Sequence, residues 1–216
     1  IDTAWTELGP AKSLIAESFV KFSREVSSIA VRGQDGDVKT WALAENHHHN
    51  GILSHSIVPA PNSTDLQPVA QDYITRLLNH LNYVGVLTLE LFVTEQGLYA
   101  NEMACRVHNS GHWSIEGAIC SQFENHIRAV AGLPLGATDV VRPTVMINII
   151  GQHPKSEDVL ALKGAHLHLY NKSERAGRKL GHITLMPNNS DELTVLCRQL
   201  AQILPVPLAL TTDMNL

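Results

Sequence analysis

The sequence predicts an α+β fold, because strand-like and helix-like segments each form distinct blocks along its 216 residues. Two pairs of alternating apolar segments are joined by turn residues, Asp35-Gly36 in one case and Glu95-Gln96-Gly97 in the other, which indicates two β-hairpins. Residues 65–81, 115–131 and 191–204 instead repeat apolar side chains every three to four positions, which predicts helices. A chain of this length forms one large domain, or a medium and a small one.

The composition excludes several classes of protein. Hydrophobic residues make up 44% of the chain and charged residues 17%, as in globular proteins. The net charge of −5 argues against a nucleic-acid partner, which needs a basic face. No apolar run approaches the ~20 residues of a membrane span, and no signal peptide opens the chain. The three cysteines lack CxxC spacing and fit a reducing compartment, so we expect a cytoplasmic protein without a membrane partner.

The first third of the chain reads as strands followed by a helix. Residues 13–22 form an apolar run that predicts a strand, and residues 25–31 and 38–44 flank the first hairpin turn. Three successive histidines follow, His47 to His49. In an extended segment His48 points away from His47 and His49, which we expect to face solvent, so the run makes a poor metal cage. Residues 51–61 continue as a strand, and residues 65–81 form a covering helix with Ser63 or Thr64 as N-cap.

The second hairpin, residues 83–104, carries a pair of acids. Gly97 suits the last position of a three-residue loop, which pairs Thr94 with Leu98. The same register places Glu90 directly opposite Glu102, on one face of the sheet. Two carboxylates there repel each other among mostly apolar neighbours, so they must share a proton or hold a cation. Oxygen ligands with Asn101 beside them favour Mg²⁺. The alternative is a solvated hairpin edge with two incidental acids.

The hairpin runs into RVHNSGHW, residues 106–113, which is dense in hydrogen-bond donors. A cation site followed by an anion-binding loop suggests phosphoryl or acyl-phosphate chemistry. The segment also reads as a polar loop that leads, through Ser114 as N-cap, into the helix 115–131. The two interpretations are compatible. Gly132 ends that helix, whose apolar face is formed by Ile119, Phe123, Ile127 and Val130.

After a linker, residues 135–142, the chain forms a smaller unit. Residues 144–150 predict a buried strand, in which the amide of Asn148 needs polar partners, and residues 166–170 predict a second strand. The segment NKSERAGRKLGH, residues 171–182, gathers cations around glycines, which describes either a nest for a phosphate monoester or a solvated basic turn. Residues 183–185 form a last strand, and a helix over residues 191–204 follows, with Ser190 as N-cap.

The motif NEMACRVHNSGHW resembles the signature of 5-(carboxyamino)imidazole ribonucleotide synthases, which are ATP-grasp enzymes of purine biosynthesis. The resemblance extends from about Ser13 to about Leu185 and includes GILSHSIVPAP, YVGVLTLELF, GAICSQFENHIRAV, TVMINIIG and RAGRKLGH. Cys105 stands where the family usually has proline. The resemblance implies that residues 1–135 are the C-terminal part of an ATP-grasp domain and residues 136–216 a small mixed β domain with a C-terminal helix. The family's N-terminal domain and phosphate-covering loop are missing, so we expect the fragment to be inactive alone.

The resemblance also implies roles for individual residues. The backbone of Glu17, Ser18, Phe19 and Val20 would bind adenine, and Glu25 the ribose hydroxyls, although Glu17 and Glu25 also read as ordinary strand-end acids. His48 and Asn101 would contact the nucleotide, and Glu90 and Glu102 would hold Mg²⁺ at the ATP phosphates. Arg106, His108 and Asn109 would bind carboxyphosphate and position the attacking amine. The ribonucleotide would be held by Ser110, Lys172, Arg175, Arg178 and Lys179.

The implied activity is carboxylation of 5-aminoimidazole ribonucleotide by ATP and bicarbonate, through carboxyphosphate, by a homodimeric enzyme of IMP biosynthesis. Two alternatives remain open. The first is another ATP-grasp carboxylate–amine ligase, against which the basic turn counts. The second is a non-catalytic nucleotide-binding or assembly module.

Overall fold

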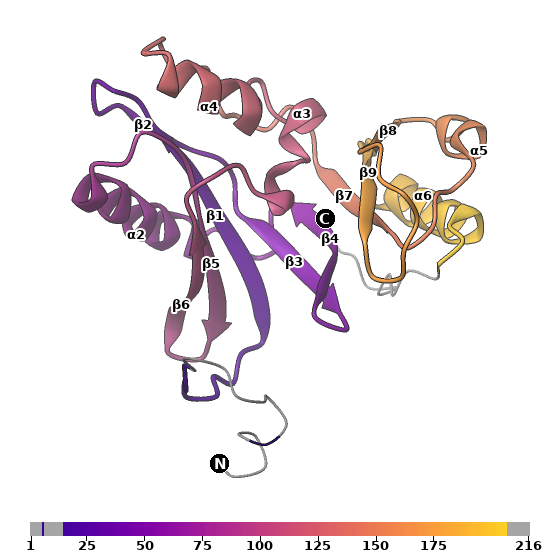
Figure 1. Ribbon diagram of the computed structural model, residues 1–216, viewed down its shortest axis with the longest axis horizontal. Coiled ribbons are helices and arrows are strands. Elements are labelled where there is room, and N and C mark those ends of the chain that lie inside the picture. Colours follow the sequence, from indigo (N-terminus) through magenta and orange to yellow (C-terminus); the bar gives the residue numbers. More distant parts are fainter. Residues whose placement is uncertain (1–5, 7–14, 207–216) are drawn as a thin grey trace.

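The computed structural model describes Thr6 and residues 15–206. Its strands form a single antiparallel sheet in the order β6-β5-β1-β3-β4-β7-β9-β8, with β2 pairing on β1 (Figure 1). The strands are β1 (Arg24–Arg32), β2 (Val38–Thr40), β3 (Ala44–His49), β4 (Ile52–Val58), β5 (Gly85–Thr94), β6 (Gly97–Ala104), β7 (Thr144–Ile150), β8 (Ala165–Leu169) and β9 (Lys179–Leu185).

Helices cover both faces of the first half of the sheet (Figure 1). Alternation along β1 explains this arrangement, since successive side chains point to opposite faces. Val26 and Ala30 pack against α2 (Leu66–Leu81), in one core cluster with Ile74. Ile29 lies in a second cluster with Trp113, on the side of α4 (Gln122–Val130). The predicted hairpin between β1 and β2 is confirmed, and so is the covering helix.

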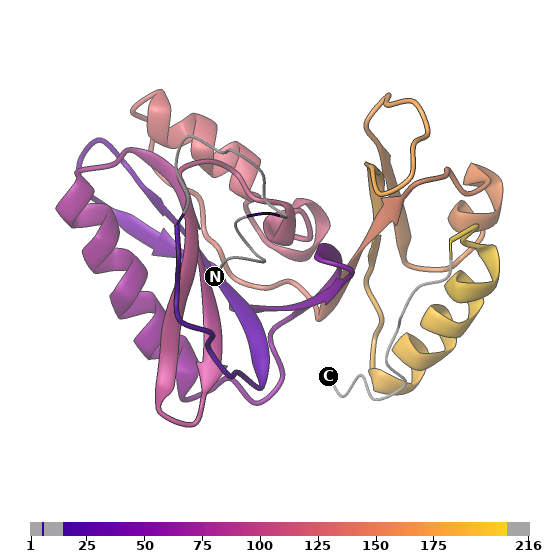
Figure 2. The same cartoon turned by 60° about the horizontal axis from the view of Figure 1, so that its bottom comes forward.

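The second half of the sheet has one helical layer, formed by α5 (Ser156–Leu160) and α6 (Ser190–Ile203), as Figure 2 shows at the right. Ile147 of β7 and Ile183 of β9 pack against Leu193 and Leu200 of α6. Pairing of β4 with β7, from His55↔Ile147 to Val58↔Thr144, joins the two halves through main-chain hydrogen bonds. The expected domain boundary near residue 135 stays a prediction. No helix within residues 15–206 combines the length and apolar character that crossing a membrane requires.

Three local predictions about the first half of the chain are wrong. The described residues 15–22 of the expected strand 13–22 have no regular structure, because regular pairing with β5 begins only after Ser23 donates to the Val93 carbonyl. Neither Ser63 nor Thr64 caps α2. Its N-cap is Asp65, and the Ser63 hydroxyl donates to the Ala60 carbonyl instead. His47 does not face solvent freely, because its ring stacks on His55 with 4.4 Å between centroids.

The predicted helix 115–131 is broken. The chain forms a 3₁₀ turn η1 (Asn109–Gly111), a short α3 (Ser114–Gly117) and then α4, which Ser121 caps by accepting from the Glu124 N–H. The break arises because Ala118 adopts an extended backbone and pairs with Val140. The apolar face of the predicted helix does not turn toward the core: Ile119, Phe123, Ile127 and Val130 are 36–65% exposed. Gln122, Asn125 and Ala129 are buried in their place, since the two amides bond loop backbone.

Two predicted helix caps are wrong as well. The N-cap of α3 is Trp113, and the hydroxyl of Ser114 donates to the Gly111 carbonyl at 2.6 Å instead of capping. The N-cap of α6 is Asn189, whose side chain accepts from the Glu192 N–H, so the helix begins one residue earlier than a Ser190 cap implies.

Candidate active site

The acidic pair of the second hairpin forms as predicted, although by another route. Thr94 pairs with Gly97, not Leu98, so the turn has two residues, Glu95 and Gln96. A β-bulge at Asn101 then restores the register, so that Glu90 is directly opposite Glu102. A bulge sets two residues of one strand against one of its partner, which leaves Asn101 beside the acidic pair.

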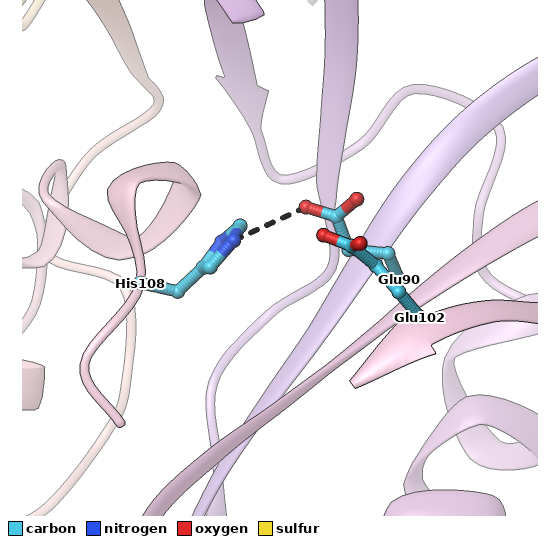
Figure 3. A group of neighbouring side chains, drawn as sticks. All are labelled: Glu90, Glu102 and His108. Atoms are coloured by element: carbon cyan, nitrogen blue, oxygen red, sulfur yellow. Dashed lines mark ion pairs between the residues drawn. The ribbon is translucent and has the colours of Figure 1, made fainter. Parts of the chain in front are cut away.

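His108 completes this cluster, as Figure 3 shows. Ligand atoms of Glu90, Glu102 and His108 all lie within 4.8 Å of one another. His108 Nε2 is 3.2 Å from a Glu90 oxygen. The backbone N–H of Ser110 donates to His108 Nδ1, which leaves the proton of the neutral ring on Nε2, facing Glu90. In this form the imidazole is a donor to an oxygen anion, and the two carboxylates are the groups suited to a cation.

Electrostatics supports that assignment. Burial, and then the negative charges of Glu102 and Glu25, raise the pKa of Glu90 to about 7. Burial, and then Arg106 and Lys179, lower the pKa of His108 to about 4. At neutral pH the imidazole is therefore uncharged, and the raised pKa of Glu90 favours its protonated form. The raised pKa of Glu90 is the direction that a second, nearby carboxylate produces, and the expectation that the pair holds a cation stays a prediction.

Eight of the seventeen predicted site residues line one cavity of about 510 Å³. It brings the metal-site acids and the anion-binding loop together with the basic turn, although these lie about 70 residues apart in the chain. Burial lowers the pKa of Lys179, an effect that the nearby Glu90 carboxylate opposes. The predicted residues that line the cavity are His48, Glu90, Glu102, Arg106, His108, Lys172, Arg178 and Lys179.

The basic segment is not entirely a turn. Strand β9 begins at Lys179, so Lys179 and His182 belong to the sheet. The turn itself is closed by the Arg178 N–H, which donates to the Arg175 carbonyl, with Gly177 at φ +71°. Arg175 lines a neighbouring cavity of about 460 Å³ rather than the main one.

Two loop residues act behind the cavity rather than in it. Ser110 is completely buried, with its hydroxyl 2.8 Å from His108 Nδ1 and 3.0 Å from the Ser27 hydroxyl. Asn109 and Asn148 form a reciprocal amide pair: Asn109 Nδ2 donates at 2.9 Å, and Asn148 Nδ2 donates back at 2.7 Å. Direct contact of Ser110 with substrate is therefore not supported, because its hydroxyl is used to orient His108.

The predicted nucleotide residues divide into two groups. His48 Nδ1 lies 2.6 Å from a Glu25 oxygen, so these two side chains are brought together at the edge of the cavity. The segment Glu17 to Val20 does not line that cavity; Phe19 is 94% exposed. No strand pairs with this segment among the described residues, so its backbone groups remain available to a ligand, and the adenine role stays a prediction.

Several supporting residues were missed from the sequence. A buried chain of polar groups runs behind His108 and Ser110: Asn46 Nδ2 bonds Ser27 Oγ, and the Ser56 hydroxyl donates to Asn46 Oδ1 at 2.8 Å. The Gln122 amide forms two hydrogen bonds with the His108 backbone: its oxygen accepts from the His108 N–H at 2.9 Å, and its nitrogen donates to the His108 carbonyl at 2.7 Å. Of the residues that support the site, only Asn148 could be singled out from the sequence, because an amide inside an apolar strand needs polar partners.

Comparisons with known proteins agree with this geometry. The family model described as the ATP-grasp domain matches residues 1–123, and that of the phosphoribosylaminoimidazole carboxylase C-terminal domain matches residues 144–195. The N5-carboxyaminoimidazole ribonucleotide synthase of Vibrio vulnificus (strain YJ016) is 49% identical over 210 residues, which cover 94% of this chain and 55% of that protein. The chain thus spans about half the length of the curated relatives it matches.

Solved structures show the same fold. The N5-carboxyaminoimidazole ribonucleotide synthetase of Thermus thermophilus superposes with a TM-score of 0.85 at 50% identity, covering 88% of this chain and 53% of that one. The synthase of Aspergillus clavatus, solved with ADP and 5-aminoimidazole ribonucleotide, has a TM-score of 0.79 at 31% identity, covering 87% of this chain and 53% of that one. The chain therefore belongs to the ATP-grasp family and, within it, to the N5-carboxyaminoimidazole ribonucleotide synthases.

Proposed function

We propose that the whole protein carboxylates 5-aminoimidazole ribonucleotide with ATP and bicarbonate, in purine biosynthesis. The observation that carries this proposal is a single cavity in which an acidic pair, a donor-rich loop and a basic turn meet. These three groups suit a metal–nucleotide, an acyl phosphate and a phosphate monoester respectively. The relative from Aspergillus clavatus, solved with ADP and the aminoimidazole ribonucleotide, supports this set of ligands.

Glu90 and Glu102 would hold Mg²⁺. Their side chains fit this ion, since two hard oxygen donors lie close together and the raised pKa of Glu90 reports a shortage of positive charge. When bound, Mg²⁺ supplies neutralisation of the charge on the ATP phosphates. Bound Mg²⁺ would favour the ionised form of Glu90, because an adjacent positive charge stabilises a carboxylate.

The remaining residues have separate tasks. A bicarbonate oxygen attacks the γ-phosphorus of ATP, ADP leaves, and the exocyclic amine then attacks the carbon of carboxyphosphate, releasing phosphate and a proton. The Arg106 guanidinium and the His108 Nε2–H would bind the oxygens of carboxyphosphate, while Asn109, through its amide pair with Asn148, would hold the loop that places them. Arg178 and Lys179 would bind the 5′-phosphate, with Lys172 beside them.

Titration calorimetry of the chain with 5-aminoimidazole ribonucleotide, and separately with Mg-ATP, tests the proposal. We expect measurable ribonucleotide affinity that Arg178→Ala weakens, with Arg198→Ala on α6 as a control. If the chain binds Mg-ATP but has no measurable affinity for the ribonucleotide, the result would instead indicate another ATP-grasp carboxylate–amine ligase. Absence of both affinities would leave an assembly module.

We also propose that the whole enzyme is a cytoplasmic homodimer. The supporting observation is the exposed apolar surface of α4, on which Phe123, Ile127 and Val130 are 36–65% exposed. A second copy is the occupant that would bury it. Sedimentation should show a dimer that Ile127→Glu dissociates, with Glu124→Gln on the same helix as a control; a monomeric wild type contradicts the proposal.

A further inference from the structure

A row of polar side chains crosses the sheet behind the anion-binding loop. Asn148 of β7 is directly opposite His182 of β9, which in turn is directly opposite His168 of β8. Directly opposed residues of antiparallel strands share a face of the sheet. The other face carries Ile147 and Ile183, which pack toward α6. We call Asn148, His182 and His168 the polar row.

Each member of the polar row meets one residue of the segment 109–116. Asn148 forms its reciprocal amide pair with Asn109. The ring of His182 lies 5.1 Å from that of His112, measured between centroids, and His168 Nε2 lies 2.6 Å from a Glu116 oxygen. Positions 109, 112 and 116 are three and four residues apart, a spacing that places side chains on one face of helical turns. The row therefore contacts the segment at regular intervals.

The polar row is connected to the basic turn. His182 Nδ1 lies 2.7 Å from the hydroxyl of Tyr170, and burial raises the pKa of that hydroxyl, so it keeps its proton and donates it to Nδ1. Lys172 Nζ lies 5.3 Å from the centroid of the Tyr170 ring, within the range of a cation–π contact. A predicted phosphate-binding lysine thus touches the residue that orients His182.

The other end of the connection reaches His108. The amide of Gln122 is oriented by the His108 backbone, which it contacts on both sides, so its Nε2 is a donor. That Nε2 lies 3.0 Å from His112 Nδ1 and donates to it. Contacts therefore run without a gap from Lys172 through Tyr170, His182, His112 and Gln122 to the backbone of His108.

Packing alone does not explain this choice of residues. His182 is 1% exposed, and its Nε2 has no hydrogen-bond partner among the described residues. A buried polar atom without a partner is destabilising, and an apolar ring of the same size would avoid that penalty. Ring stacking on His168, at 4.4 Å between centroids, would survive such a replacement. What an apolar ring would lose is the bond to Tyr170.

We propose that Asn148, Tyr170 and His182 are positioning residues, which hold the basic turn at a fixed separation from the loop that carries Arg106, His108 and Asn109. The proposal rests on the proposed function. The bound ribonucleotide spans that separation, since its phosphate lies at the turn and its amine must reach carboxyphosphate at the loop. A looser connection leaves each half of the site intact but misplaces the amine. Carboxyphosphate then reacts with water, and ATP is consumed without carboxylation.

The experiment measures ADP released per carboxylated ribonucleotide in the full-length enzyme. We expect this ratio to rise roughly threefold or more in Tyr170→Phe and in Asn148→Leu, the scale of one lost hydrogen bond. His166→Phe is the control, because His166 is an exposed histidine of β8 outside the polar row. A merely structural role would lower both products together. Wild-type ratios in both variants would overturn the proposal.

A second measurement separates this proposal from the proposed function. Hydrogen exchange of the isolated chain reports on the loop without requiring activity. We expect the Gly111 and His112 amides, which donate to loop carbonyls, to exchange roughly threefold faster or more in both variants but not in the control. Should the wild-type enzyme fail to carboxylate, faster exchange would still support the positioning contact. Unchanged exchange would overturn it.

Discussion

Replacing Glu90 by glutamine should change how the stability of the chain depends on pH. The pKa of Glu90 is about 7 in the folded chain, against an ordinary value of 4.5. The folded state therefore binds more protons than the unfolded state between these values, and the free energy of unfolding falls as pH rises from 4.5 through 7. At ~1.36 kcal/mol for each pH unit, the difference costs the wild type ~3 kcal/mol above pH 7.

Glutamine removes this cost because it has no proton to lose, and its oxygen still accepts from His108 Nε2. The free energy of unfolding of Glu90→Gln should exceed that of the wild type by ~3 kcal/mol at pH 8, and by little at pH 4.5. Urea denaturation in the presence of a chelator, at intervals from pH 4.5 to pH 8, measures the difference directly. Glu95→Gln is the control, since Glu95 lies in the exposed turn of the same hairpin.

Adding Mg²⁺ also tests what raises the pKa of Glu90. If crowding of two acids and burial raise the pKa, saturating Mg²⁺ should stabilise the wild type and narrow its gap to Glu90→Gln at pH 8. A difference between the two proteins that stays constant within ~0.5 kcal/mol across the pH range would refute the reasoning, because it would mean that Glu90 titrates normally.

Three further predictions concern single residues. Glu102→Gln in the full-length enzyme should fold normally yet lose most ATP cleavage, since one of two metal-site carboxylates is gone; wild-type ADP release would remove the metal assignment. Arg178→Ala should raise the KM for the ribonucleotide roughly tenfold or more, the scale of a lost charged hydrogen bond, while the KM for ATP stays nearly constant; the reverse pattern would place the phosphate elsewhere. Gly181→Ala should lower the free energy of unfolding by ~1–3 kcal/mol in urea, because its Cβ would lie 2.2 Å from the His168 carbonyl oxygen; unchanged stability would contradict that contact.

Sequence periodicity predicted the existence of most strands and of the helix α2, because alternating and helical spacings of apolar residues reflect partial burial. It failed for the expected strand over residues 13–22, whose described part has no regular structure. It failed on α4, where polar residues are buried and apolar ones exposed. Gln122 and Asn125 are buried because they bond the backbone of distant loops, which no local pattern reveals. The run of Ile119, Phe123, Ile127 and Val130 has helical spacing in either case, so periodicity could not tell which side faces the core.

The site shows a similar division. Pairing of Glu90 with Glu102 could be predicted because a three-residue loop and a two-residue turn with a later bulge give the same partner. Assembly of the basic turn beside that pair could not be predicted from spacing, since it depends on β4 pairing with β7 across about 90 residues of chain. The supporting contacts of Ser27 and Asn46 could not be predicted for the same reason, because each joins residues of two neighbouring strands whose pairing the sequence does not reveal.

The main-chain pairing of β4 with β7 has a mechanical consequence. A hinge rotation between the two halves of the chain would break the hydrogen bonds from His55↔Ile147 to Val58↔Thr144. The acids of the hairpin and the cations of the basic turn are therefore carried by strands of one continuous sheet and the loops that join them. We therefore expect the separation between the acids and the cations to change little when ligands bind, so that any opening of the proposed site would involve segments outside the sheet.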